Sequence, residues 1–448
     1  MNKIKLIYLL LIVSLSLSAQ DNPQQFSLEE AIDYALKNNR IAKNAEKDIA
    51  AAKQQKWETT AIGLPQVNVT INYQNFLKQQ ISLVPAEFFG GNPGEFAEVI
   101  FGTQQNVNAT ATINQLLFDG SYLVGLQSAK VFLEISENAK IKTDLEIRKS
   151  VINAYGNVLL AEESVAIFEK NIAVLEKNVN DTQKIYENGL GDEESVEQLQ
   201  ITLSGLKSNL ANAKRLQSIA YQMLNITLGI EFNQPTILTD NLESLTLKHI
   251  DLQPLVEEND VTKNIDYRIA ENDKVSKELL LKLEKSKALP QLSAYLNGGY
   301  LGFSDEFTFL DRDQSWAGFS SFGFNLNIPI FSSFQRRSAT QRAKINLEKA
   351  EENLKQTEQM LNLEIETAKS NYQFATEDYY NKKDNLKLAE SIEQKNQTKF
   401  FEGVGSSFEL NQAQSQLYTA QQELLQAMLN VITNKVELET LTNNITDN

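Results

Sequence analysis

Carboxylates beside two glycine pairs are the residues of this sequence with the clearest chemical potential. The pairs are Gly189 with Gly191 and Gly403 with Gly405. The polar residues near them are Asp192, Glu193, Glu194, Glu197, Glu402, Glu409 and Gln412. Carboxylates attract cations, but at the start of a helix they also interact favourably with the helix dipole. Both interpretations are open from the sequence.

Catalytic chemistry is not expected. The chain has a single histidine, His249, and no cysteine, which excludes a Cys nucleophile and leaves zinc and Ser-His-Asp sites with one histidine at most. The segment 189–191 lacks the Lys-Ser/Thr of a nucleotide-binding loop. We therefore predict no enzyme activity, no cofactor and no metal site, and a solvated or capping role for His249.

The N-terminus has the pattern of a secretory signal peptide. Lys3 and Lys5 precede an apolar run over 6–17, and Ser18 and Ala19 follow it. The run is shorter than the ~20 residues that a membrane-spanning helix needs, and no later stretch is as apolar. We assign residues 1–19 to the signal peptide and expect no helical membrane anchor.

Composition indicates long uninterrupted elements, because the 448 residues include only 8 Pro and 19 Gly, most of them clustered. The formal net charge of −16 disfavours nucleic acid as a partner. The acidity either keeps long helices soluble or has a selective role.

The sequence contains an internal duplication. Leu64-Pro65 returns as Leu289-Pro290, Phe118-Asp119-Gly120 as Phe331-Ser332-Ser333, and the first glycine pair as the second. The interval between the Leu-Pro and the Phe is longer in the first copy, which predicts a loop there. We place the first repeat at 20–253 and the second at 254–448.

Each repeat is predicted to contain helices and two strands. In the first repeat we expect helices within 27–62, strands over 66–76 and 106–118, a long helix over 120–188, a return helix over 192–228 and a connector over 231–253. In the second we expect a helix over 254–288, strands over 291–303 and 315–331, a long helix over 334–402 and a return helix over 407–441. Ser27 and Glu30 have the spacing of a capping box at the first helix.

The strand segments are two-faced. Val67, Val69 and Ile71 alternate with Asn68 and Thr70, and the polar face carries almost no charge. The lengths suit a tilted strand that crosses a bilayer, although a half-buried soluble sheet has the same pattern. Aromatic residues near the strand ends form either an interfacial girdle or a core. They are Tyr73, Phe76, Tyr300, Phe303, Trp316 and Phe319.

The long helices require neighbours. Residues 120–188 contain no Pro and would form a rod of about 100 Å. A soluble coiled-coil spacer would explain these helices alone equally well. Four strands, however, cannot close a barrel, and open edges in lipid are costly. Two chains would give eight strands with a filled interior, whereas three would give twelve strands and a lumen.

In this order and spacing, the duplicated motifs resemble the TolC family of outer-membrane efflux proteins over essentially the whole mature chain. The resemblance implies a mainly α fold with a membrane β-barrel. Long α-helical hairpins would form a periplasmic α-barrel, and four transmembrane strands per chain would form a twelve-stranded barrel in a homotrimer. It also implies a passive conduit in the bacterial outer membrane, extending into the periplasm.

As partners, the resemblance implies a periplasmic adaptor and an inner-membrane transporter, which open the closed tip during efflux or type I secretion. Family members carry an acidic ring after the second reversal. Here Glu409 matches it, but Gln412 stands where an Asp is frequent. A periplasmic adaptor and a structural coiled-coil protein are the alternative functions. The duplicated strands argue against both.

Overall fold

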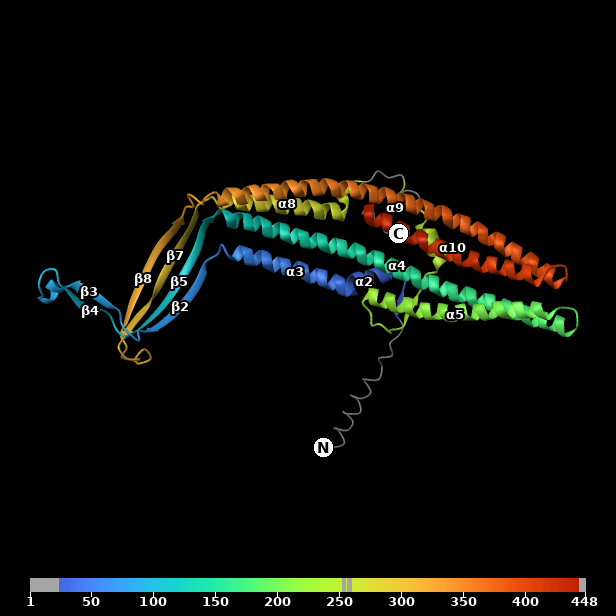
Figure 1. Cartoon of the computed structure of the whole chain (residues 1–448), viewed down its shortest axis with the longest axis horizontal. Helices are drawn as coiled ribbons and strands as arrows, with labels where there is room; N and C mark the ends of the chain where they lie inside the picture. Colours follow the sequence, from blue (N-terminus) through green and yellow to red (C-terminus); the bar gives the residue numbers. More distant parts are fainter. Residues whose placement is uncertain (1–23, 252–254, 256–259, 443–448) are drawn as a thin grey trace, which may run out of the picture. The chain divides into compact units, whose positions relative to one another are not determined.

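The computed structural model describes residues 24–251, 255 and 260–442 (Figure 1). The predicted signal peptide lies outside these residues. The chain divides into two compact units, one containing residues up to 49, 135–271 and from 353, the other 50–134 and 272–352. Each unit takes residues from both sequence repeats. The predicted boundary at 253/254 therefore separates the repeats of the sequence and not the compact units.

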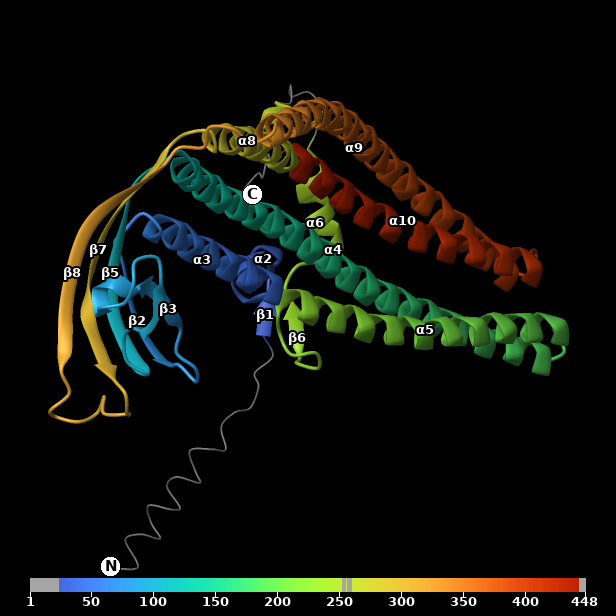
Figure 2. The same ribbon diagram turned by 60° about the vertical axis from the view of Figure 1, so that its left-hand side comes forward.

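The second unit contains a four-stranded antiparallel sheet. Its strands are β2 (Gln66–Asn75), β5 (Gln105–Asp119), β7 (Gln291–Ser304) and β8 (Trp316–Asn327), in the order β2-β5-β7-β8 (Figure 2). The register aligns Val67 with Ile113, Leu296 and Phe322 across the sheet. Because alternate side chains point to opposite faces, this row belongs to an apolar face, and the Asn and Thr residues of β2 and β5 lie on the other.

The interval between β2 and β5 is not a simple loop. It contains a separate hairpin of β3 (Ile81–Pro85) and β4 (Phe96–Ile100), joined through a short 3-10 helix, η1 (Ala86–Phe89). The sequence prediction placed a loop here, and the alternation of apolar residues in these short strands was not recognised.

The last strand is shorter than predicted. We expected it over 315–331, but β8 ends at Asn327. Asn327 pairs with Gln291, the first residue of β7, so the ladder between β7 and β8 ends there. Pro290 and Pro329 stand just beyond this end and have no N–H to donate to a neighbouring strand.

Two asparagines determine where helices begin. The helix predicted within 27–62 is divided at Asn39 into α2 (Leu28–Asn38) and α3 (Arg40–Ala61), and the Asn39 Oδ1 accepts from the Ile41 N–H at 2.7 Å. The helix predicted over 254–288 corresponds to α8 (Ile265–Ser286), where Asn264 Oδ1 accepts from the Asp266 N–H at 2.7 Å. Both are side-chain caps of a new helix start.

The long helices form two hairpins. α4 (Gly120–Glu187) reverses into α5 (Glu193–Leu228), and α9 (Gln335–Phe401) reverses into α10 (Ser407–Thr442) (Figure 1). The main core of the first unit includes Tyr155, Leu224, Tyr372 and Ile432, all fully buried. A smaller apolar cluster closer to the reversals contains Ile172, Leu175, Leu199, Leu206 and Leu410. Among the described residues, no helix has the length and apolarity to cross a bilayer.

The connector between the repeats contains both strand and helix. β1 (Gln24–Phe26) pairs in parallel with β6 (Thr236–Leu238), and α6 (Leu242–His249) follows, with a 3-10 turn, η2 (Val261–Lys263), before α8. The Tyr155 hydroxyl lies 2.8 Å from the Asp240 carboxylate and 3.0 Å from the Phe26 carbonyl oxygen. The connector is thus fixed to the middle of α4.

Candidate functional site

The first helix reversal depends on the conformation of Gly189. Its φ is +75°, a left-handed value that costs a residue with a Cβ. The Gly189 N–H donates to the Tyr186 carbonyl at 2.8 Å and the Leu190 N–H to the Ile185 carbonyl at 3.1 Å. These two hydrogen bonds are those of a Schellman motif, which terminates α4.

The second reversal repeats this geometry. Gly403 has a φ of +76°, and its N–H donates to the Phe400 carbonyl at 3.1 Å. The second glycine of each pair has a different role, since neither Gly191 nor Gly405 is left-handed. A Cβ on Gly405 would lie 2.9 Å from the Lys399 Cβ, so the turn needs a small residue there.

Two of the predicted gate acids cap the returning helices. Asp192 Oδ1 accepts from the Ser195 N–H at 2.7 Å at the start of α5. At the start of α10, the Ser406 N–H donates to Glu409 Oε2 at 3.0 Å, and the Glu409 N–H donates to Ser406 Oγ at 3.2 Å, a capping box. The helix-start interpretation therefore applies to both residues.

The other predicted gate residues are exposed at the reversals. They are Glu193, Glu194, Glu197, Glu402 and Gln412. Glu194 accepts a hydrogen bond from Gln198 at 3.1 Å within α5. Nowhere in the described residues do three His, Cys, Asp or Glu side chains group as metal ligands. These acids can therefore supply a diffuse negative field at the reversals.

The two hairpins are joined by uncharged polar side chains, which we call the amide seam. Its hydrogen-bonded pairs are Ser164–Gln422 at 3.5 Å, Asn171–Gln421 at 2.8 Å, Asn178–Gln397 at 3.2 Å, Gln198–Ser407 at 3.0 Å and Thr202–Asn411 at 2.9 Å. Three of the α4 members are spaced by seven residues, so they follow one stripe of that helix. This spacing is visible in the sequence but is not among the features predicted from it.

Ion pairs connect the two arms inside each hairpin. Lys207 and Lys214 of α5 pair with Glu176 and Glu169 of α4, each at 2.7 Å. Lys382 of α9 pairs with a glutamate of α10 at 3.0 Å. Ion pairs thus tie each hairpin internally. Between the hairpins near the reversals, the described contacts include the amide seam and the packing of Leu410 of α10 against the apolar cluster of α4 and α5.

Some polar atoms along the seam are buried without a hydrogen bond. They include Asn178 Nδ2 and Thr182 Oγ1 of α4. A buried polar group without a partner weakens packing by about 1–3 kcal/mol. Burial also raises the pKa of the nearby Glu393 carboxyl on α9. The seam is accordingly a less favourable contact than the apolar layers beside it.

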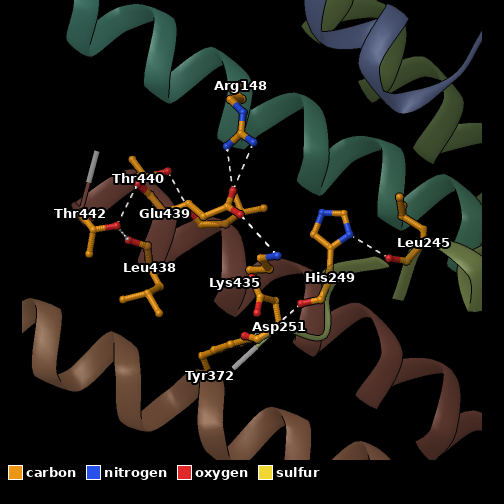
Figure 3. Close-up of polar contacts among 11 residues, drawn as sticks. Arg148, Leu245, His249, Asp251, Tyr372, Lys435, Leu438, Glu439, Thr440 and Thr442 are labelled. Atoms are coloured by element: carbon orange, nitrogen blue, oxygen red, sulfur yellow. Dashed lines mark hydrogen bonds and ion pairs between the residues drawn. The ribbon is translucent and has the colours of Figure 1, made fainter. Parts of the chain in front are cut away.

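A buried ionic cluster lies beside the connector, and sequence reasoning missed it (Figure 3). Both terminal nitrogens of Arg148 lie 3.2 Å from Glu439 Oε2, and Lys435 Nζ lies 3.7 Å from Glu439 Oε1. Lys435 is 1% exposed and Glu439 4% exposed. Lys435 and Glu439 stand on α10 and Arg148 on α4, so only the fold brings the three together.

His249 lies at the edge of this cluster. Its Nδ1 is 2.8 Å from the Leu245 carbonyl oxygen, which is a capping contact at the end of α6, as predicted. The side chain is half-buried, however, and lines a cavity of about 170 Å³ with Arg148 and Lys435. Burial lowers the pKa of His249 and outweighs the hydrogen bond to the Leu245 carbonyl, which raises it. The charges of Lys435 and Arg148 also lower the pKa, whereas that of Glu439 raises it.

The six predicted girdle aromatics do not share one face of the sheet. The register places Tyr73, Tyr300 and Trp316 on the apolar face, whereas Phe303 and Phe319 lie on the polar face. Phe76 follows the end of β2. All six lie toward the end of the sheet that is remote from the helices, because β2 and β7 run toward it and β8 begins there.

Comparison with known proteins identifies the family. Residues 31–229 and 280–444 match the model of the outer membrane efflux protein family, one segment for each sequence repeat. The chain belongs to this family. This efflux protein is therefore an outer-membrane channel of a tripartite system that extends into the periplasm, as the sequence resemblance predicted. No curated protein matches the sequence.

Solved structures of outer-membrane channels have the same fold as this efflux protein. The CusC structure has a TM-score of 0.74 at 19% identity and covers 95% of both chains. CmeC of Campylobacter jejuni has a TM-score of 0.71 at 16% identity, with 93% and 85% covered. VceC of Vibrio cholerae has a TM-score of 0.69 at 16% identity, with 93% and 95% covered. The predicted fold class, with long hairpins, few strands and an internal duplication, is confirmed.

Proposed function

We propose that three copies of this efflux protein form one passive conduit and that each copy contributes four strands to a twelve-stranded barrel. The observation that carries this proposal is the pair of open sheet edges. β2 and β8 are the outer strands of the sheet, and nearly all their residues are exposed. Unpaired strand edges are not tolerated in lipid, so another chain must cover them.

The direction of the edge strands suits closure by identical copies. The four strands alternate in direction, so β8 of one copy can pair with β2 of the next in the same antiparallel manner. Such a head-to-tail contact closes into a ring. The uncharged polar face with Asn68, Thr70 and Asn72 favours a water-filled lumen, which twelve strands leave and eight do not.

The helices also carry faces that a neighbouring copy would cover. α5 exposes Leu216, Ile219, Met223 and Ile226, which follow one helix face. α9 exposes a second set of large apolar residues, Met360, Leu363, Phe374, Leu388 and Ile392. One set belongs to each sequence repeat. Contact between such faces of adjacent copies would surround a continuous helical tunnel.

The conduit would be closed at the helix reversals and opened by partners. A periplasmic adaptor and an inner-membrane transporter are the partners that the family implies, and they would supply the energy. The amide seam supports this gate, because it can exchange its hydrogen bonds for water when the hairpins separate. The exposed acids at the reversals would make the entrance prefer cations.

Planar-bilayer recording tests the conduit. The purified protein, extracted in detergent, should insert as a trimer and give discrete conductance steps that increase when the seam is weakened. A protein that is released by salt without detergent and gives no conductance would refute the proposal and favour the adaptor or coiled-coil alternatives.

A further inference from the structure

The segment between β8 and α9 exposes large apolar side chains. Ile330 is 88% exposed, Phe331 76% and Phe334 65%. The rings of Phe331 and Phe334 meet edge to face, with 6.1 Å between centroids. They lie at the end of the sheet that joins the helices, opposite the end that carries the predicted girdle.

The backbone holds this aromatic pair in a strained turn. Ser333 has a φ of 48° and Phe334 a φ of 65°, left-handed values that are rare for residues other than glycine. Arg336 fixes the turn, since its Nη1 donates to the Pro329 carbonyl at 2.8 Å and its Nη2 to the Ile330 carbonyl at 3.2 Å. A strained turn that presents two aromatic rings to the outside suggests a function for those rings.

The start of α9 is basic although the chain is acidic. Before Glu348 it carries Arg336, Arg337, Arg342 and Lys344 and no acid, in a chain of net charge −16. Cations at a helix N-terminus oppose the helix dipole, so helix stability does not explain them. The corresponding start of α4 in the first repeat has only Lys130 before Glu134. The basic cluster is thus a feature of the second repeat alone.

Two of these cations remain available to a ligand. Arg336 is used in the turn, and Lys344 lies 3.5 Å from Glu348. Arg337 and Arg342 are exposed. In a neighbouring copy, the segment 59–65 before β2 contains no carboxylate, and Glu58 at the end of α3 directly precedes it. A second copy could cover the rings, but this part of it offers one acid to the two arginines.

We propose that Phe331, Phe334, Arg337 and Arg342 form a binding site for an anionic phospholipid of the inner leaflet of the outer membrane. This inference rests on the proposed function, in which the sheet crosses the membrane and the helices lie in the periplasm. In outer-membrane barrels, girdles of aromatic residues lie at both membrane interfaces. Guanidinium groups bind phosphate, and basic clusters beside a membrane segment attract anionic lipid.

Native mass spectrometry of the trimer tests the site with phosphatidylglycerol and phosphatidylcholine as probes. The wild-type trimer should retain phosphatidylglycerol in preference to phosphatidylcholine. In Arg337→Gln/Arg342→Gln the preference should fall about tenfold or more, as expected for the loss of two basic residues near an anionic headgroup. Lys130→Gln, at the corresponding helix start of the first repeat, should leave the preference unchanged.

A second variant separates lipid binding from copy contact. Phe331→Ser/Phe334→Ser should weaken retention of both lipids and leave the trimer intact. The inference would be overturned if the arginine variant kept the lipid preference of the wild type. It would also be overturned if the phenylalanine variant dissociated into monomers that still selected phosphatidylglycerol. A wild-type protein that is monomeric would instead refute the proposed function, and the same spectrum reports it.

Discussion

Asn171 of α4 donates a side-chain hydrogen bond to Gln421 of α10 at 2.8 Å, across the contact between the two hairpins. Within one hairpin, by contrast, Lys207 and Glu176 form an ion pair at 2.7 Å. Water can replace an amide pair at little net cost, because the net contribution of such a bond is about 1 kcal/mol. The Lys207–Glu176 pair is half-exposed and also contributes at most about 1 kcal/mol. The seam is uncharged, so water can take over its hydrogen bonds if the hairpins separate.

Replacing the amide pair with apolar residues should hold the hairpins together. In Asn171→Leu/Gln421→Leu the polar groups of a buried and a half-buried side chain are both removed, so we expect stability equal to or above that of the wild type and reduced conductance. The single variant Asn171→Leu should lose about 1 kcal/mol, because the hydrogen bond is lost while the half-buried Gln421 keeps its polar group. Thermal unfolding and bilayer conductance measure the two effects.

A matched control removes an interaction inside one hairpin. Lys207→Gln breaks a half-exposed ion pair and should change stability by at most about 1 kcal/mol, with unchanged conductance. Equal conductance in the wild type and the double leucine variant would show that the seam takes no part in opening.

The buried His249 predicts how stability depends on pH. Its pKa in the folded protein is below the ordinary value of 6.5, so the unfolded chain binds more protons as the pH falls. The contribution of neutral His249 is complete above about pH 6.5 and is lost as the pH falls below that value. His249→Gln should therefore lose less thermal stability than the wild type between pH 7.5 and 5.5. Parallel pH curves for the two proteins would be inconsistent with this burial.

The left-handed glycine of each reversal should not tolerate a side chain. Gly189→Ala should destabilise the reversal by about 1–2 kcal/mol, because φ is +75° there. Gly125→Ala, inside α4 with ordinary contact distance around a new Cβ, should instead be neutral or stabilise by up to about 1 kcal/mol. Amide hydrogen exchange across residues 185–195 would show faster exchange only for the first variant. The same response in both would count against the Schellman geometry.

The exposed acids predict the ion preference of the entrance. Changing Glu193, Glu194, Glu197 and Glu402 together to Gln should shift the reversal potential in a KCl gradient toward a non-selective value. Gln412→Asp should shift it in the opposite direction, since Gln412 is exposed near the same reversal. Asp192→Asn keeps a capping oxygen at the start of α5 and removes one exposed charge, so it should shift the potential in the same direction by a smaller amount. An unchanged potential in all variants would reject the cation preference.

The strands and helices of the two repeats could be predicted because the periods of their apolar residues differ. A period of two marks the strands, and Leu-Pro pairs and Gly pairs mark the ends of the helices. The faces of the aromatics could also have been predicted. Phe303 follows Tyr300 by three residues and Phe319 follows Trp316 by three, an odd spacing that places the members of each pair on opposite faces.

The ionic cluster could not be predicted from the sequence. Arg148 and Glu439 are separated by 291 residues, and no local pattern indicates that α4 and α10 meet there. The burial of His249 also depends on the contact between α4 and α10. The end of β8 depends on its pairing, because the ladder stops at Asn327, which faces the first residue of β7.

Closure of the sheet by identical copies is tested most directly by engineered disulfides between β2 and β8. The chain has no cysteine, so a pair such as Thr70→Cys/Ser321→Cys reports only the designed contact. Further pairs keep Thr70→Cys and move the second cysteine along β8 in steps of two residues. The control pair Asn114→Cys/Tyr295→Cys joins neighbouring strands of one chain. We expect covalent dimers and trimers from at least one β2–β8 pair in membranes and only monomers from the control. Monomers from every β2–β8 pair, with an efficient control disulfide, would contradict the shared barrel.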